Sequence, residues 1–172
     1  MDEKLRQAIR SIPDFPKKGI LFRDITTLLK DKAAFAEAIN VLASRHKGKG
    51  IAKVVGMESR GFILGAPIAY LLGAGFVPVR KKGKLPAETY AATYQLEYGT
   101  DKIEIHKDAI ERGEKVLVVD DLLATGGTAT ATIDLLKNFN ATIAEIDFLI
   151  ELTDLQGREK LRGYEVFTLV RY

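Results

Sequence analysis

The sequence contains no cysteine and no tryptophan, and it has only two histidines in 172 residues. The absence of cysteine excludes a disulfide framework, a thiolate zinc site and a cysteine nucleophile. No apolar run approaches the roughly 20 residues that a membrane-spanning helix requires. The N-terminus, MDEKLRQAIR, is charged and lacks the apolar core of a signal peptide. We therefore expect a soluble, cytoplasmic protein with no membrane partner.

The two histidines, His46 and His106, are also far apart in the sequence. Neither has a second histidine nearby that would indicate a metal site, and we assign neither a catalytic role. His46 follows Arg45 near the end of a predicted helix, where contact with the helix dipole is expected.

The composition is that of an ordinary globular chain, with 47% hydrophobic and 28% charged residues. A chain of this length predicts one domain with a substantial core. The net charge of +3 is spread along the sequence. This small excess suits an anionic small molecule, and it does not favour a nucleic-acid partner.

Short apolar runs alternate with longer amphipathic ones, the pattern of an α/β fold with an open, mainly parallel twisted sheet flanked by helices. The run VLVV at 116–119 has no polar alternation, which is typical of a strand covered on both faces. Asp31 is a predicted N-cap, and GlyLysGly at 48–50 is a predicted helix stop. The predicted strands are Ile51–Gly56, Gly75–Arg80, Lys115–Asp120, Ala141–Ile150 and Tyr164–Val170, and the predicted helices are Lys32–Arg45, Gly61–Leu72, Gly127–Asn138 and Leu155–Leu161.

Two stretches interrupt this alternation. FPKKGILFRDIT at 15–26 mixes prolines, a glycine and aromatic residues ahead of the first predicted strand. The stretch 81–102 is long, polar and rich in tyrosine. A connection of that length indicates either a functional lid or a β-hairpin arm, and its length does not separate the two.

The segment that follows the third predicted strand has the features of a phosphate-binding loop. Gly126 and Gly127 allow the backbone to approach an anion closely, and Thr125 and Thr128 offer hydroxyl donors. Gly127 opens a helix whose N-terminal amides would point at the ligand. The loop lacks the lysine of a nucleoside-triphosphate P-loop and does not have the spacing of a dinucleotide fingerprint.

Two carboxylates, Asp120 and Asp121, stand immediately before this loop. Carboxylates repel phosphate, but they accept hydrogen bonds from hydroxyls and bind divalent cations. A ribose phosphate satisfies both features, with its phosphate in the loop and its 2′ and 3′ hydroxyls against the acids. The structural alternative is a turn in which Asp120 only caps the next element.

A second strand-to-helix junction lies at Gly56–Phe62, where Ser59 and Arg60 stand at a helix entrance. Backbone amides and a guanidinium together form a strong receptor for phosphate oxygens. Further basic residues follow the neighbouring strand, namely Arg80, Lys81, Lys82 and Lys84. Each lysine alone is more often a solvated surface charge, whereas the group predicts a second anion site.

The segment VLVVDDLLATGGTA at 116–129 resembles the phosphoribosyl pyrophosphate (PRPP) binding motif of the type I phosphoribosyltransferases. Four more segments resemble the branch of that family that uses adenine, and together they cover most of the chain in the family's order. They are IPDFPKKGILFRDIT, MESRGF, RKKGKLP and LEYGTDKIEIHKDAI. The resemblance implies one phosphoribosyltransferase domain over residues 1–172, with an N-terminal hood at 1–30 and a lid at 81–102.

The resemblance also implies roles for individual residues. Asp120 and Asp121 would bind the ribose hydroxyls and favour the cationic transition state. It implies a non-proline cis peptide at Glu58–Ser59 and contacts from Arg60, Arg80 and Lys84 to the pyrophosphate. The 5′-phosphate would bind to Ala124, Thr125, Gly126, Gly127 and Thr128.

For the base, the resemblance implies a site at Leu21, Phe22 and Arg23, closed on the other side by Leu122. Phe22 on its own would be read as a packing residue. In the lid, Glu97 would offset the proton on adenine N7, and Tyr94 and Tyr98 would cover the site or only pack the arm.

The implied reaction is transfer of the phosphoribosyl group of PRPP to adenine, giving AMP and pyrophosphate in purine salvage, with Mg²⁺ bound through the pyrophosphate and a homodimeric enzyme. Three alternatives stay open: a sister transferase for hypoxanthine, guanine, xanthine or orotate, a PRPP-sensing regulator that binds RNA or DNA, and a PRPP synthase-like enzyme. The sequence shows neither a helix-turn-helix nor an RNA-binding signature, and it has no ATP-binding segment.

Overall fold

The computed structural model describes residues 2–95 and 100–172. The chain forms two compact units, the first ending at Val41 and the second comprising Leu42–Tyr172. Within the described residues, none of the helices has the length and apolar character needed to cross a membrane.

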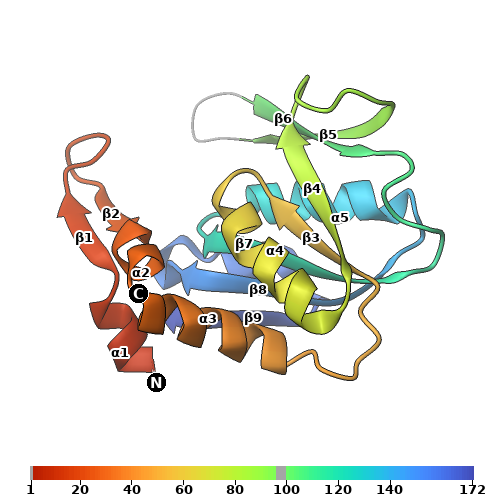
Figure 1. Ribbon diagram of the computed structural model, residues 1–172. Helices are drawn as coiled ribbons and strands as arrows, with labels where there is room; N and C mark the ends of the chain where they lie inside the picture. The colour runs from red at the N-terminus through yellow and green to blue at the C-terminus, as the bar shows by residue number, and fades with distance from the viewer. Residues whose placement is uncertain (1, 96–99) are drawn as a thin grey trace. The chain divides into compact units, whose positions relative to one another are not determined.

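The first unit contains short elements around a two-stranded antiparallel sheet (Figure 1). Arg10 pairs with Asp24 across this sheet, and the guanidinium hydrogen bonds lower the pKa of Asp24 to about 2. The carboxylate of Asp31 accepts hydrogen bonds from the backbone N–H groups of Ala33 and Ala34, at 2.9 and 2.8 Å, which confirms the predicted N-cap. The elements are α1 (Asp2–Gln7), β1 (Arg10–Pro13), β2 (Leu21–Asp24), α2 (Thr26–Lys30) and the first part of α3 (Lys32–Ser44).

The second unit contains a seven-stranded sheet in the order β5-β6-β4-β3-β7-β8-β9. The five strands from β4 to β9 in this order are parallel, and β6 joins β4 and β5 antiparallel. The strands are β3 (Lys53–Met57), β4 (Gly75–Lys81), β5 (Thr89–Gln95), β6 (Thr100–His106), β7 (Lys115–Leu123), β8 (Thr142–Glu151) and β9 (Val166–Arg171). The predicted parallel α/β sheet is therefore confirmed.

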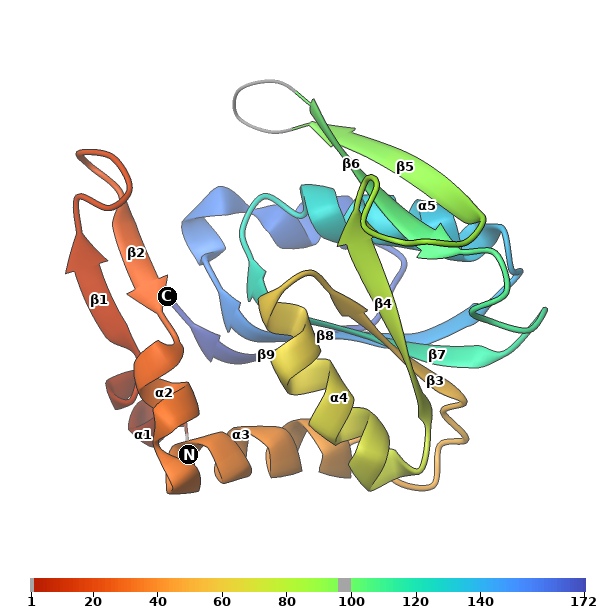
Figure 2. The same ribbon diagram turned by 45° about the horizontal axis from the view of Figure 1, so that its top comes forward.

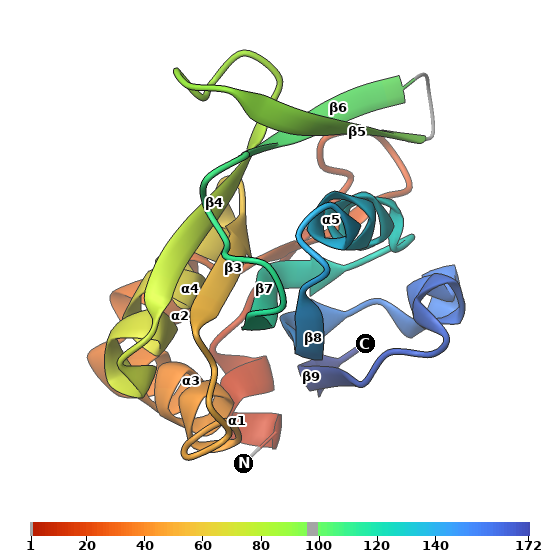
Figure 3. The same cartoon turned by 90° about the vertical axis from the view of Figure 1, so that its right-hand side faces the viewer.

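Helices α4 (Arg60–Leu72) and α5 (Gly127–Lys137) cover opposite faces of this sheet, which Figures 2 and 3 show from two directions. The four residues Val116–Val119 on the central strand β7 are fully buried, as a strand covered on both faces requires. Alternate side chains of β3, β4 and β7 pack with Leu135 and Leu136 of α5 in one continuous apolar core. This core fixes the ends of β3 and β7, where the predicted site residues lie.

Two predicted elements differ in the structure. The helix predicted at 155–161 is instead a pair of short 3-10 helices, η1 (Thr153–Leu155) and η2 (Gly157–Leu161). Gln156 between them adopts a left-handed conformation with φ of 51°, which interrupts a right-handed helix. For the stretch 81–102, the sequence left open a functional lid or a β-hairpin arm. The stretch contains most of the antiparallel β5–β6 hairpin, so its structure corresponds to the β-hairpin arm.

A charged cluster is buried on β8, in the second unit. His46 is 1% exposed, and its Nε2 lies 2.8 Å from Asp147 Oδ2 and 3.6 Å from Glu145 Oε2. Arg45 binds Glu145 at 2.5 Å and stacks over the Phe167 ring. The main partners of His46 are thus these carboxylates rather than the helix dipole that the sequence predicted. The hydrogen bonds between these basic and acidic side chains offset part of the cost of burying the two carboxylates and the imidazole.

Candidate active site

Two strand-to-helix junctions meet at the carboxyl edge of the sheet. β3 leads through Glu58 and Ser59 into α4, and the neighbouring β7 leads through Ala124–Gly126 into α5. The peptide bond between Glu58 and Ser59 is cis, as the resemblance implies. Since ligands of open α/β sheets bind beyond the carboxyl ends of the strands, this edge is the expected site.

Gly61 allows the two junctions to come together. A Cβ atom at this position would lie 2.9 Å from Asp120 Oδ1 and 3.0 Å from the carbonyl oxygen of Val119. At these distances an added side chain would require the Asp120 carboxylate or the backbone of β7 to shift, so glycine at this position lets the first turn of α4 approach β7 this closely. The residues of both junctions therefore face one space.

The two adjacent acids are held in a defined geometry. The backbone N–H of Asp121 donates to Asp120 Oδ1 at 2.9 Å, and Arg60 Nε lies 2.9 Å from Asp121 Oδ2. Burial, together with the neighbouring charge of Asp121, raises the pKa of Asp120 well above its ordinary value. Burial also raises the pKa of Asp121, although Arg60 offsets part of this effect. Of the described basic side chains, Arg60 is the one in ion-pair contact with this acidic pair, and it offsets part of the pair's charge.

A cavity of about 460 Å³ opens over this pair. It brings together nine predicted site residues from both junctions, β7 and the arm: Glu58, Ser59, Arg60, Tyr94, Asp120, Asp121, Leu122, Ala124 and Thr128. A smaller hollow of about 60 Å³ lies along the glycine loop. It is lined by Thr125, Gly126 and Gly127, the residues of the predicted 5′-phosphate site that do not line the larger cavity. Gly126 has φ of 77° and is the N-cap of α5. The loop backbone therefore lines the space where a phosphate is predicted.

The basic residues at the end of β4 and just beyond it separate into two groups. The guanidinium of Arg80 donates to both carboxylate oxygens of Glu58, at 3.3 and 3.2 Å, and to the Lys84 carbonyl oxygen. Burial alone would raise the pKa of Glu58, but these bonds and one from the Lys81 N–H outweigh it and lower the pKa. Neither Arg80 nor Lys84 lines the cavity, whereas Lys81 does.

Strand alternation explains this separation. Val79 and Lys81 are two residues apart on β4, so they point to the same face, and both line the cavity. Arg80 lies between them and points the other way. The sequence groups Lys81 with Arg80, Lys82 and Lys84 as a predicted second anion site, and of these four residues only Lys81 lines the cavity. Counting alternate residues from the buried Val77 and Val79 is the signal that would have singled it out.

The β5–β6 arm reaches the cavity through Tyr94. Its hydroxyl donates to Asp101 Oδ2 at 3.3 Å, and the Lys81 ammonium lies 3.3 Å from the same oxygen. Burial and the Asp101 charge raise the pKa of Tyr94. Glu97 and Tyr98, the other predicted lid residues, lie outside the described residues, so their roles stay predictions.

The residues predicted to bind the base are divided between the two units. Leu122 lies on β7 and lines the cavity. Leu21, Phe22 and Arg23 are consecutive on β2 of the first unit, where Leu21 is exposed and Phe22 contacts the edge of Phe15 at a centroid distance of 5.2 Å. Their role in base binding stays a prediction.

Among the described side chains, one group has the composition and spacing to hold a metal ion, namely His46, Glu145 and Asp147. Arg45 already occupies a carboxylate oxygen of Glu145. A divalent cation there would have to compete with this guanidinium. The carboxylates that border the cavity, Asp120 and Asp121, have the hard oxygen donors that suit Mg²⁺ or its bound water.

Comparison with known proteins identifies the class. The family model of the phosphoribosyl transferase domain matches residues 24–170, a range that includes both junctions and the arm. An adenine phosphoribosyltransferase from Halothermothrix orenii is 58% identical over 168 residues, which are 98% of this chain and 99% of the relative. Within the phosphoribosyl transferases, the chain belongs to the adenine phosphoribosyltransferase family.

Solved structures agree with this assignment. The adenine phosphoribosyltransferase of Thermoanaerobacter pseudethanolicus has a TM-score of 0.96 and 53% identity, and the match covers both chains completely. The enzyme of Saccharomyces cerevisiae has a TM-score of 0.93 and 43% identity, and the match covers 98% of this chain and 97% of that one. The yeast enzyme was solved with adenine and an imino-altritol bisphosphate.

The raised pKa of Asp120 predicts a gain in stability for Asp120→Asn. A carboxyl group whose pKa is higher in the folded than in the unfolded protein does not change the stability at pH values below its unfolded pKa. At pH values above its folded pKa, it lowers the stability by the full amount. The variant removes this cost, so its melting temperature should exceed that of the wild type by a few degrees at pH 7, with the difference vanishing near pH 3. Calorimetric melting across this pH range measures the effect.

The matched control is Asp24→Asn, for which the expected change in stability has the opposite sign. The pKa of Asp24 is lowered to about 2 by Arg10 and backbone hydrogen bonds, so its stabilising effect is present above the unfolded pKa and is lost as the pH falls through the folded one. This variant should be less stable than the wild type at pH 7. A melting temperature of Asp120→Asn below that of the wild type at pH 7 would contradict the proposed repulsion between Asp120 and Asp121.

Proposed function

We propose that this protein transfers the phosphoribosyl group of PRPP to adenine, giving AMP and pyrophosphate. The reaction inverts the anomeric carbon of the ribose and needs no covalent nucleophile from the protein. Catalysis would come from positioning the two substrates on opposite faces of the sugar and from stabilising positive charge on the ribose.

The observation that carries this proposal is the pair Asp120–Asp121 in one cavity, between two junctions that are each predicted to bind an anion. A ligand with phosphate at each end and a diol in the middle is complementary to that arrangement, and PRPP has this structure. Family membership supports the choice of PRPP. The yeast relative's complex with adenine and a bisphosphate supports adenine as the acceptor.

At the phosphate end, the backbone of Ala124–Thr128 and the hydroxyls of Thr125 and Thr128 would bind the 5′-phosphate. Asp120 and Asp121 would accept hydrogen bonds from the ribose hydroxyls. As the bond to pyrophosphate lengthens, positive charge develops on the ribose, and the nearby carboxylates stabilise it. The pair thus binds the ground state and favours the transition state.

At the other end, Ser59 and Arg60 would bind the pyrophosphate with the backbone of the first turn of α4. Arg80 would act by holding Glu58 and the backbone of Lys84, and Lys81, which lines the cavity, would contact the pyrophosphate directly. We also propose that PRPP binds as its Mg²⁺ complex, in which the cation neutralises pyrophosphate charge and improves the leaving group.

Leu21, Phe22, Arg23 and Leu122 are the proposed adenine site, with Phe22 stacking on the purine. The proposed role of Glu97 is to offset the proton at adenine N7. The arm that carries Tyr94 and Tyr98 would cover the site, because water would otherwise capture the oxocarbenium-like sugar.

We further propose a homodimer. The outer face of α4 exposes Ile63, Tyr70 and Leu71, at 42%, 85% and 43%, and these residues share one helical stripe. Such an apolar stripe is a candidate interface. Sedimentation equilibrium at micromolar protein should give twice the chain mass, with Tyr70→Lys shifting the protein toward monomer. A wild-type monomer under these conditions would rule the dimer out.

The combined substitution Asp120→Asn and Asp121→Asn should lower kcat/KM for PRPP by about 100-fold or more, because it removes the charge that stabilises the transition state. Steady-state formation of AMP measures the effect. Asp134→Asn is the control, since Asp134 is an exposed residue of α5 paired with Lys137. Turnover of the double variant near the wild-type rate would exclude the proposed role.

Product formation from PRPP with each candidate base tests the acceptor. Adenine should give AMP at a kcat/KM at least about 100-fold above that for hypoxanthine, guanine, xanthine and orotate, since a site built for an amino edge rejects bases that lack it. Turnover should stop when EDTA removes divalent cations and return with Mg²⁺. A higher kcat/KM with another base would contradict adenine transfer and indicate a sister transferase for that base. Retention of nucleic acid on filters at physiological salt would instead favour the PRPP-sensing regulator.

A further inference from the structure

The glycine loop rests on a second backbone segment, the start of η2. A Cβ atom at Gly157 would lie 2.1 Å from the carbonyl oxygen of Ala124 and 3.0 Å from the Gly126 nitrogen. Reciprocally, a Cβ atom at Gly126 would lie 2.6 Å from the carbonyl oxygen of Gly157. The two segments are thus in direct backbone contact, with no side chain between them. Any displacement of η2 must be transmitted to the loop.

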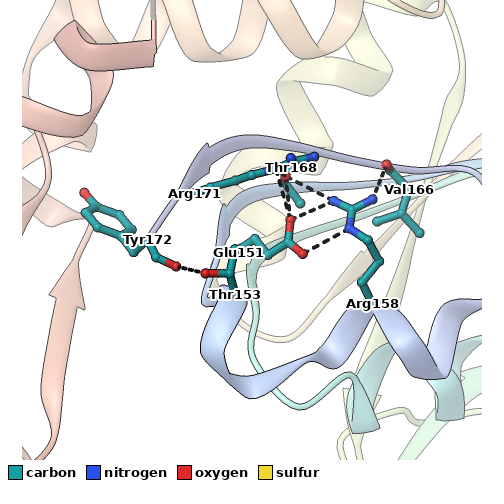
Figure 4. Close-up of polar contacts among 7 residues, drawn as sticks. All are labelled: Glu151, Thr153, Arg158, Val166, Thr168, Arg171 and Tyr172. Carbon is teal, nitrogen blue, oxygen red and sulfur yellow. Dashed lines mark hydrogen bonds and ion pairs between the residues drawn. The ribbon is translucent and has the colours of Figure 1, made fainter.

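The η2 segment is in turn fixed by Arg158, whose contacts Figure 4 shows. Its guanidinium binds both carboxylate oxygens of Glu151, at 3.0 and 2.7 Å, and donates to the carbonyl oxygen of Val166 at 2.8 Å. Thr168 completes the group, since its hydroxyl donates to Glu151 Oε2 at 2.9 Å. Bidentate pairs of this kind fix orientation as well as distance. Arg158 therefore ties η2 to both β8 and β9.

Glu151 connects this group to the strand that carries the acids. It is 6% exposed and lies directly opposite Leu123, the last residue of β7, in the parallel register. The next residue, Leu152, donates its N–H to the Leu123 carbonyl oxygen at 2.9 Å. Hydrogen bonds from Arg158 outweigh the effect of burial and lower the pKa of Glu151, so the carboxylate is ionised at neutral pH. The anchor is thus rigidly connected to the loop's own strand.

We propose that Glu151, Arg158 and Gly157 are positioning residues for phosphate binding. The Glu151–Arg158 pair holds Gly157 against Ala124 and Gly126, and this contact keeps the loop backbone in its anion-binding conformation before the ligand arrives. None of the three residues lines the main cavity. Preorganisation lowers the ordering cost of binding, so loosening the contact weakens phosphate binding without changing any group that touches the ligand.

This inference rests on the proposed role of Ala124–Thr128 as the 5′-phosphate site. The experiment is calorimetric titration of the full-length protein with ribose 5-phosphate, together with steady-state KM values for PRPP and adenine. Gly157→Ala and Arg158→Met should each raise the Kd of ribose 5-phosphate about tenfold or more, because small misplacements of a binding backbone have large effects. The KM for PRPP should rise in parallel, while the KM for adenine should stay within about twofold.

Two matched controls separate positioning from general damage. Gly75→Ala makes the same chemical change, but the added Cβ meets only the flexible side chain of Lys53, at 3.0 Å. Arg171→Met removes another guanidinium near Glu151, at 3.3 Å, and leaves the Arg158 bonds in place. Both controls should bind ribose 5-phosphate as the wild type does. Arg158→Lys, which keeps the charge and loses the bidentate geometry, should restore only part of the affinity.

Amide hydrogen exchange supplies a readout that does not depend on the ligand. Residues 124–128 should exchange faster in Arg158→Met than in Arg171→Met, with the amides of β3 unchanged. Wild-type affinity and exchange in both Gly157→Ala and Arg158→Met would overturn the proposal, and so would an equal loss of affinity for PRPP and adenine. Wild-type protein that binds no ribose 5-phosphate, combined with the expected exchange pattern, would instead refute the proposed phosphate site.

Discussion

Two adjacent carboxylates at the end of β7 are the constraint on which the rest of the site depends. Asp120 and Asp121 repel each other, and burial raises the pKa of both. Among the described residues, the ion pair with Arg60 offsets part of this cost. Asp121 is buried and Asp120 is partly buried, so the pair costs folding free energy when both side chains are ionised. The fold tolerates it because the apolar core beneath, built on β3, β7 and α5, supplies the compensating stability.

The carboxylates are useful only if the groups around them are fixed, and the fold achieves this with backbone rather than with side chains. Gly61 lets α4 approach β7 from one side, and Gly157 lets η2 rest against the loop from the other. Backbone segments in direct contact have no rotamers to lose. A site built this way holds its backbone N–H groups in fixed positions, and such preorganised donors are what electrostatic catalysis requires.

Much of this could be read from local sequence. VLVV predicted a strand buried on both faces and Asp31 predicted an N-cap, and the structure confirms both, because each signal depends on neighbours within a few residues. The pattern from Asp120 to Thr128 predicted the loop between β7 and α5, and its role in anion binding stays a prediction. Other features depended on distant partners. The bond from His46 to Asp147 joins positions that are 101 residues apart, so no local pattern indicates it. Likewise, only the extent and register of β4 showed that the side chains of Lys81 and Arg80 point to opposite faces of the sheet.

The sequence by itself determined the fold class, the two strand-to-helix junctions and the family, because hydrophobic periodicity and glycine spacing act over short distances and are written directly in the chain. Only the tertiary structure decided which of these residues share one cavity, that Arg80 holds Glu58, and that Gly157 supports the glycine loop. These outcomes depend on strand order and on approaches of a few ångströms between segments far apart in sequence. Such approaches are set by packing of the whole sheet, so they cannot be derived from any one segment.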